Sequence, residues 1–183
     1  MTVYIILGIL AVLLLFVLVA YNSLVMLRNK VKEAFATMDV SLKKRYDLIP
    51  ALVEVVKGYA GHEAQTLEKV TQMRGVAAGN NDLNGQIASE VRIGDTLKTL
   101  FAVVEAYPDL KANNSFLTLQ QQLSQMEDEI ALSRRYYNGS VREYNNRCQV
   151  FPYNLIASLF NFKDMPMFSV GSASERQVVE VKL

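Results

Sequence analysis

Hydrophobic residues form an unbroken run at the start of the chain. The stretch from Val3 to Ala20 holds no charged residue and no proline, and Gly8 is its only glycine. As a helix it would be roughly 27 Å long, close to the ~30 Å hydrocarbon core of a bilayer. Each Leu, Ile, Val or Phe favours membrane insertion by about 0.3–0.6 kcal/mol. The pattern predicts a single-pass transmembrane helix, with an anchor that comprises residues 1–23.

A cleaved signal peptide is the alternative interpretation of this segment. A secretory signal has Lys or Arg ahead of its apolar stretch and small residues at the cleavage site. Only Met1 and Thr2 precede the run, and its exit at residues 19–22 (VAYN) lacks a convincing A-x-A pattern. These features favour a retained anchor.

After the anchor, apolar residues recur every three or four positions, which is typical of amphipathic helices. No helix breaker separates the first of these patterns from the anchor, so we expect one continuous helix to emerge from the membrane. It should end or bend between Arg45 and Pro50. Asp47 is then a candidate N-cap of a second helix, from about Leu48 to Ala77, with Pro50 in its first turn.

Two further helical patterns cover residues 87–104 and 116–151. The second has a coiled-coil-like alternation of three- and four-residue steps, with one extra step of four. Residues 154–160 can add one or two turns after Pro152. Four amphipathic helices with short connections predict an all-α fold, an antiparallel four-helix bundle that comprises residues 24–160.

The C-terminal tail, residues 161–183, has a different pattern. After a Gly- and Ser-containing stretch, Val179, Val181 and Leu183 alternate with Glu180 and Lys182, as on one face of a β-strand. A helical bundle offers no sheet to join, so we expect this segment to pair with a second copy or with a partner's sheet edge by strand addition. The alternative is an irregular terminus that rests on the bundle.

Composition limits the chemistry of the chain. The net charge of +1 provides no electrostatic footprint for nucleic acid. Cys148 is the only cysteine, which excludes an intrachain disulfide, and its apolar register predicts a buried structural thiol. His62 is the only histidine and has no second histidine at zinc-binding spacing. We therefore expect no catalytic, cofactor-binding or metal site, and a non-enzymatic role.

Basic residues predict the orientation of the chain in the membrane. None precedes the apolar run, whereas Arg28, Lys30 and Lys32 follow it closely. Cytoplasmic flanks of membrane helices are enriched in Lys and Arg. The N-terminus is therefore expected outside the cell membrane and the bundle in the cytoplasm.

Several polar-rich stretches are more specific than a bundle core requires. They are YNSLV and RN within 21–29, DVSLKKRYDLIP at 39–50, VKGYA and HE within 56–63, EAYPDLKAN at 105–113, and ED, RRYYN and YN within 127–145. In order and spacing they resemble the LemA family of bacterial membrane-anchored proteins, over about residues 21–162. At Phe35 that family usually has Trp, which is a conservative departure.

The resemblance implies an N-terminal transmembrane helix joined to an antiparallel helical bundle at the bacterial inner membrane, without established catalytic residues. Relatives are linked with membrane remodelling in magnetosome-forming bacteria, and with membrane stress functions that involve a neighbouring zinc metallopeptidase. Neither role transfers to this chain by similarity alone.

The motif residues have two interpretations. In the first they form a structural polar network of interhelical pairs and caps that sets the bundle register. In the second they form a groove or lateral surface that recognises a partner. The residues concerned are Asp39, Arg45, Asp47, Glu127, Arg134, Arg135 and Asn138.

The connector after the third helix is less easily explained by packing and is the better binding candidate. Its candidate interaction residues are Tyr107, Pro108, Asp109, Lys111 and Asn113, joined by the apolar tail positions named above. The sequence predicts a membrane-anchored scaffold that self-associates and could shape the bilayer. The alternative is an adaptor of a membrane protease or signalling protein in envelope stress.

Overall fold

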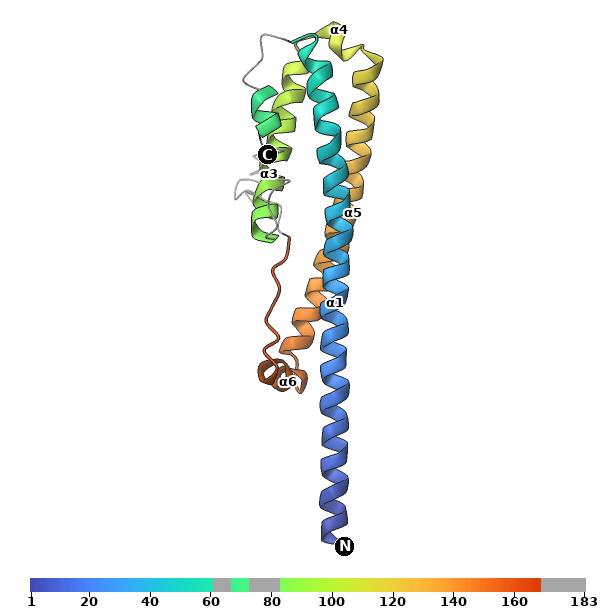
Figure 1. Ribbon diagram of the computed structural model, residues 1–183, viewed down its shortest axis with the longest axis vertical. Coiled ribbons are helices and arrows are strands. Elements are labelled where there is room, and N and C mark those ends of the chain that lie inside the picture. Colours follow the sequence, from blue (N-terminus) through green and yellow to red (C-terminus); the bar gives the residue numbers. More distant parts are fainter. Residues whose placement is uncertain (61–66, 73–82, 169–183) are drawn as a thin grey trace, which may run out of the picture. The chain divides into compact units, whose positions relative to one another are not determined.

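The computed structural model describes residues 1–60, 67–72 and 83–168 of the chain (Figure 1). Its regular structure is helical, and no strand occurs within those described ranges. The helices are α1 (Thr2–Lys57), α3 (Leu83–Val104), α4 (Pro108–Lys111), α5 (Asn114–Gln149) and α6 (Tyr153–Leu159). Residues 67–72 are also helical. The predicted tail strand, and the predicted end of the second helix at about Ala77, lie outside the described residues.

The chain divides into two compact units. Unit 1 combines residues 1–39 with residues 132–167, and unit 2 combines the described residues between 40 and 131 with Phe168. Helices α1 and α5 therefore each contribute one part to unit 1 and another part to unit 2.

Helix α1 continues through Pro50 without ending. The prediction that the helix ends between Arg45 and Pro50, with Asp47 as the N-cap of a new helix from Leu48, is wrong, because α1 continues to Lys57. Pro50 removes one backbone hydrogen bond, a cost of about 3 kcal/mol in a helix interior. The apolar stripe nevertheless continues past it, because Ile49, Leu52 and Val56 are all buried at helical spacing. Burial of such side chains stabilises by about 1.5–3 kcal/mol each, which outweighs the proline.

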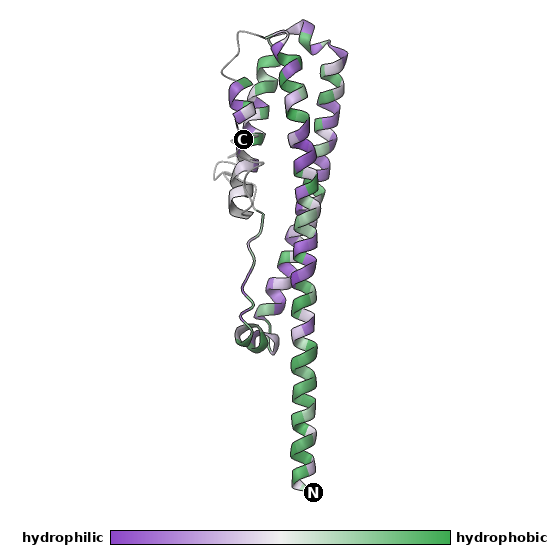
Figure 2. Ribbon diagram, in the orientation of Figure 1, coloured by the Kyte–Doolittle hydropathy of each residue, from purple (hydrophilic) through white to green (hydrophobic). Residues whose placement is uncertain are grey.

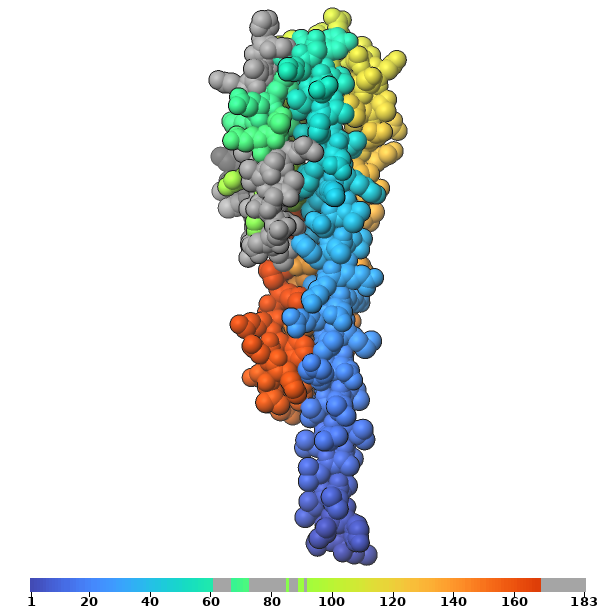
Figure 3. Space-filling view, in the orientation of Figure 1, coloured from blue at the N-terminus to red at the C-terminus, as the bar shows by residue number. Residues whose placement is uncertain are grey.

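The first third of α1 exposes its apolar side chains. Leu10 and Leu14 are 58% and 59% exposed, and the stretch is uniformly hydrophobic in Figure 2. On the face shown in Figure 3, the first turns of α1 are not covered by other described residues of unit 1. Mean hydropathy over the most apolar 18-residue window is 3.2, and only 6% of that window is buried. By length and composition this segment is a candidate membrane span, and its exposure distinguishes it from a core helix.

In unit 1, α1 and α5 pack along one another. The ring of Phe35 meets the ring of Tyr137 edge-on, with centroids 5.9 Å apart, and Lys30 Nζ binds Glu143 Oε2 at 2.7 Å. The side chains buried in this unit are Ala20, Leu24, Val31, Ala34 and Met38 of α1, and Tyr137, Val141, Tyr144 and Cys148 of α5. Helix α5 confirms the predicted helix at 116–151, and α6 confirms the extra turns predicted at 154–160.

In unit 2, the second part of α1 packs with α3, α4 and the first part of α5. The rings of Phe101 on α3 and Phe116 on α5 meet edge-on, with centroids 6.2 Å apart. The buried apolar side chains here include Leu42, Ile49, Leu52, Leu67, Val70, Ile93, Leu97, Leu100, Val104, Leu110, Phe116, Leu123 and Ile130. Helix α3 confirms the helix predicted at 87–104.

Candidate functional site

A buried group of charged and polar side chains joins three helices of unit 2. Arg45 of α1 donates through Nη2 to the Glu90 carboxylate of α3, and through Nη1 to Glu127 Oε1 of α5 at 2.7 Å. The Tyr46 hydroxyl donates to the other oxygen of Glu90. Arg45 is 1% exposed and Glu90 is 2% exposed, whereas the Glu127 side chain is 49% exposed. These four residues form what we call the charge cluster.

The helical register brings Arg45 into the core. It lies three residues after Leu42 and four before Ile49, on the stripe that α1 buries. Burial lowers the pKa of the Arg45 guanidinium, but the carboxylates of Glu90 and Glu127 raise it by more, so the guanidinium stays charged. Burial and the neighbouring Glu90 raise the pKa of Tyr46, which keeps its hydroxyl a donor at neutral pH. The charged Arg45 side chain therefore links α1 to both α3 and α5.

Sequence reasoning identified Arg45 and Glu127 but missed Glu90 and Tyr46. The missed signal was register, because Glu90 lies three residues before buried Ile93 and seven before buried Leu97. A carboxylate on the core-facing stripe of a helix requires a cation or several donors. Arg45 meets that requirement.

The other members of the predicted polar network lie at scattered positions. Asp47 is exposed on α1 in unit 2, and Asp39 is exposed on α1 in unit 1. Arg134 and Asn138 are half-buried on α5, and Arg135 is exposed there. The structure brings Arg45 and Glu127 together, and the wider network stays a prediction.

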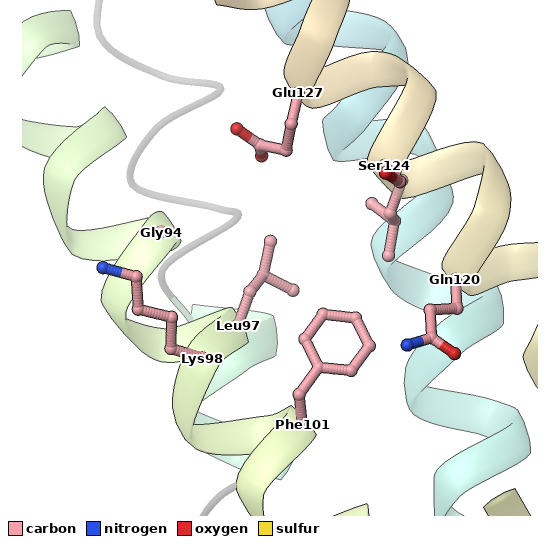
Figure 4. A pocket seen from close by; sticks show the side chains of 8 residues that line it. Gly94, Leu97, Lys98, Phe101, Gln120, Ser124 and Glu127 are labelled. Atoms are coloured by element: carbon pink, nitrogen blue, oxygen red, sulfur yellow. The ribbon is translucent and has the colours of Figure 1, made fainter.

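A cavity of about 360 Å³ lies between α3 and α5 beside the charge cluster (Figure 4). Leu97 and Phe101 project into it from α3, and Glu127 reaches it from α5 while binding Arg45. The rest of its lining is Gly94, Lys98, Gln120, Leu123 and Ser124. This volume lies within the range of small-ligand pockets. Its apolar walls and single carboxylate suit binding of an apolar group better than they suit catalysis.

The connector between α3 and α5 has a largely structural explanation. Asn113 is the N-cap of α5, because its Oδ1 accepts the N–H groups of Ser115 at 2.9 Å and Phe116 at 3.1 Å. Its Nδ2 donates to the Tyr59 hydroxyl at 2.9 Å. Pro108 occupies the start of α4, where its missing N–H costs nothing.

The remaining connector residues lie nearer the solvent. Lys111 Nζ pairs with Glu105 Oε2 at 2.6 Å on the surface. Tyr107 is half-buried ahead of α4, and Asp109 is exposed in its first turn. Asp109 and Tyr107 are therefore the best remaining interaction candidates of the connector.

A row of side chains on α5 holds the extended segment at residues 163–166 within unit 1. The hydroxyl of Tyr137 donates to the Pro166 carbonyl at 2.9 Å, and that of Tyr144 donates to the Lys163 carbonyl at 3.1 Å. Asn145 exchanges two hydrogen bonds of 2.9 Å with the backbone of Met165. The sequence did not predict these contacts between α5 and residues 163–166, although the seven-residue spacing of Tyr137 and Tyr144 places both on one helix face.

Burial raises the pKa values of three groups on α5 near these hydrogen bonds. It raises the pKa of Tyr137, and together with a hydrogen bond to Cys148 it raises the pKa of Tyr144 to about 12. Burial also raises the pKa of the Cys148 thiol, which is 6% exposed. The prediction that Cys148 is buried is confirmed. Within the described ranges, no three His, Cys, Asp or Glu side chains gather in an arrangement that could hold a metal ion.

Comparison with known proteins identifies the family to which this sequence belongs. The sequence model of the LemA family matches residues 34–183. The chain belongs to the LemA family. This match confirms the resemblance that the polar motifs indicated, and it begins after the apolar stretch of α1.

Individual relatives cover most of the chain. The chain is 28% identical over 161 residues to Protein LemA of Metamycoplasma hominis. This alignment covers 87% of the chain and 72% of the relative. The chain is 23% identical over 192 residues to Magnetosome protein MamQ 2 of Paramagnetospirillum magneticum, and that alignment covers 91% of this chain and 71% of the relative. Magnetosome protein MamQ of Magnetospirillum gryphiswaldense is 22% identical over 188 residues, with 88% and 69% covered.

Proposed function

We propose that this LemA-family protein is a non-enzymatic scaffold that self-associates at the bacterial inner membrane and organises or shapes it. The observation that carries the proposal is the single helix α1, which joins an exposed apolar segment to the packed helical body. Contacts between two bodies would therefore act directly on two membrane spans. None of the relatives named above is named as an enzyme, and the MamQ proteins are named for a cellular structure, the magnetosome.

We further propose that the helical body is an antiparallel four-helix bundle. In unit 1, contacts pair Lys30 with Glu143 and Phe35 with Tyr137. Residue numbers therefore increase along α1 in the direction in which they decrease along α5. In unit 2, Lys44 pairs with Glu129, and Tyr59 lies at the cap of α5. This order of contacts is typical of antiparallel helix pairs. The fourth helix would be the one that includes residues 67–72.

A candidate surface for self-association lies on α5 within unit 1. Leu132 and Tyr136 are 59% and 47% exposed and lie four residues apart, on one side of the helix. Apolar side chains that are neighbours on a helix surface are suited to contact between copies. A second copy of the chain presents the same surface, so a two-fold contact would be self-complementary.

The mass of the full-length protein in detergent tests the scaffold. We expect light scattering during size exclusion to give a protein mass above that of one chain, and Leu132→Glu to lower it. Gln122→Glu, which adds the same charge at another exposed position of α5, is the matched control and should leave the mass unchanged. A monodisperse monomer across micromolar concentrations would contradict the proposal.

The proposed orientation places the N-terminus outside and the helical body in the cytoplasm. It is supported by exposed Arg28 and Lys32 shortly after the apolar segment. In a Cys148→Ser background, Asp95→Cys provides one exposed thiol on α3. A membrane-impermeant maleimide should label it only after lysis, and labelling in intact spheroplasts would reverse the assignment.

A second candidate function is that of an adaptor for another membrane protein, such as a zinc metallopeptidase. Exposed Asp109 and half-buried Tyr107 favour it, because Asp109 lies on the short helix α4, which buried Leu110 fixes in place, and Tyr107 directly precedes that helix. A photo-crosslinking residue at position 109 distinguishes the two functions in cells. Crosslinks between copies alone favour the scaffold, and a reproducible second protein favours the adaptor.

A further inference from the structure

Helix α6 and the turn before it expose large apolar side chains within unit 1. Leu155 and Leu159 are 60% and 73% exposed, and their four-residue spacing in α6 places them on one side of the helix. Phe151, in the turn before the helix, is 74% exposed. Ile156 and Ala157 are buried on the other side, at 6% and 4% exposure. The exposed positions of α6 thus form an apolar side at Leu155 and Leu159, beside the polar residues Asn154 and Ser158. A surface helix surrounded by water alone would carry polar residues at Leu155 and Leu159 as well.

The position of α6 explains what surrounds this outer side. The Phe16 ring, near the end of the apolar stretch of α1, meets the Tyr153 ring with centroids 6.1 Å apart. Tyr21, just after that stretch, meets Phe160 at 4.9 Å and Phe162 at 5.7 Å. Figure 1 shows α6 beside α1 at this level. Lipid that surrounds the last turns of the span would therefore reach α6 as well.

The polar groups around α6 fit the headgroup region. The helix itself, with the sequence YNLIASL, carries no charge. Arg147 places its guanidinium 4.8 Å above the Tyr153 ring, and exposed Lys163 follows the helix. Tyrosines are enriched at membrane–water interfaces, and Lys and Arg there interact favourably with lipid phosphates. Asp164 is the nearby acid, and its Oδ2 accepts a hydrogen bond from Gln149.

We propose that α6 is an interfacial membrane helix, which inserts Leu155 and Leu159 into the leaflet from which α1 emerges. This inference rests on the proposed membrane anchor and adds a second contact with the same bilayer. Two contacts fix how the helical body is oriented over the membrane, because a single span alone can rotate and tilt. Apolar side chains added to one leaflet also widen that leaflet, which supplies a physical route to bending.

Single-tryptophan variants of the full-length protein test this contact, since the natural chain contains no Trp. The variants are reconstituted in phosphatidylcholine–phosphatidylglycerol vesicles that contain lipids brominated on their acyl chains. Leu155→Trp should emit at shorter wavelength than in water and lose most of its fluorescence to the brominated lipid. Leu132→Trp is the matched control, because Leu132 is 59% exposed and lies on α5 of the same unit. It should not be quenched.

A third probe, Leu10→Trp in the span, separates the inference from the proposal on which it rests. If Leu10→Trp is quenched while Leu155→Trp behaves like Leu132→Trp, the anchor stands and the interfacial helix is ruled out. If Leu10→Trp is not quenched, the proposed anchor itself fails, and the inference fails with it. Leu159→Trp repeats the measurement on the same side of α6, so it decides the outcome should Leu155→Trp lose its helical circular dichroism.

Discussion

Arg45 and Glu127, 82 positions apart in the sequence, are joined by a hydrogen bond of 2.7 Å between Nη1 and Oε1. The same guanidinium binds Glu90, so one side chain connects α1 with both α3 and α5. Arg45 is deeply buried, and removal of one partner from such a group leaves the other charge without compensation. The stability of unit 2 should therefore depend strongly on this residue.

Arg45→Met should lower the free energy of unfolding by about 3–5 kcal/mol, because it leaves the Glu90 carboxylate buried without its cation. Urea denaturation followed by circular dichroism measures this loss. Lys44→Met, which breaks the half-exposed pair of Lys44 and Glu129 at 3.5 Å, is the neighbouring control. It should cost at most about 1 kcal/mol. The double variant Arg45→Met, Glu90→Leu should recover much of the loss, and a double variant no more stable than Arg45→Met would contradict the charge-pairing explanation.

Pro50→Ala should stabilise the protein. It restores the backbone N–H that an uninterrupted α1 lacks at this position, a gain that can reach about 3 kcal/mol. Part of that gain is offset, by about 0.4–1 kcal/mol, because alanine has more freedom in the unfolded chain. Thermal unfolding in detergent measures the change. A lower melting temperature would contradict the expectation that the missing N–H of Pro50 weakens α1.

Asn113→Ala should destabilise the start of α5 by about 0.5–2 kcal/mol, because Oδ1 no longer accepts the N–H groups of Ser115 and Phe116. Asn113→Asp keeps a capping oxygen and should retain most of the stability. Tyr59→Phe removes only the hydrogen bond from Asn113 Nδ2 and serves as a control for that bond. Hydrogen exchange of the first turn of α5 reports the effect locally, and unchanged exchange in Asn113→Ala would argue that the connector residues serve binding instead.

Cys148 should react slowly with a thiol reagent in the native protein and rapidly in denaturant. Burial raises the pKa of the thiol, so at neutral pH the native state holds less of the reactive thiolate than the unfolded state does. Because the thiolate forms as pH increases, the native rate should rise toward alkaline pH. Asp95→Cys in a Cys148→Ser background provides the exposed comparison. Equal rates for the two proteins would mean that Cys148 is accessible.

Deletion of residues 176–183 tests the strand predicted in the tail, which carries Val179, Val181 and Leu183. The helical circular dichroism and the thermal midpoint should stay nearly unchanged, because the described helices end before this segment. The mass of the assembled species should fall if the tail pairs with a second copy. An unchanged mass would leave assembly to the helix surfaces and the membrane span.

Local pattern was sufficient to predict most helices of this protein. An apolar run without charge, and apolar residues at three- and four-residue spacing, depend only on helical geometry and on the water or lipid around it. The sequence alone therefore determined the apolar span, the helices α3 and α5, the turns of α6 and the burial of Cys148. The LemA motifs were likewise readable as residue order and spacing.

At positions where local preference and packing disagree, tertiary structure decided the outcome. It also decided which distant residues meet. Pro50 predicts a break locally, but buried neighbours on both sides keep α1 continuous. Glu90 is one of many carboxylates in the sequence, and only the packing of α3 against α1 makes it the partner of Arg45. The outward side of α6 also needed the fold, because only its contact with the end of the apolar span indicates what surrounds it. Spacing sets the face on which a side chain lies, and packing chooses the neighbour that this face meets.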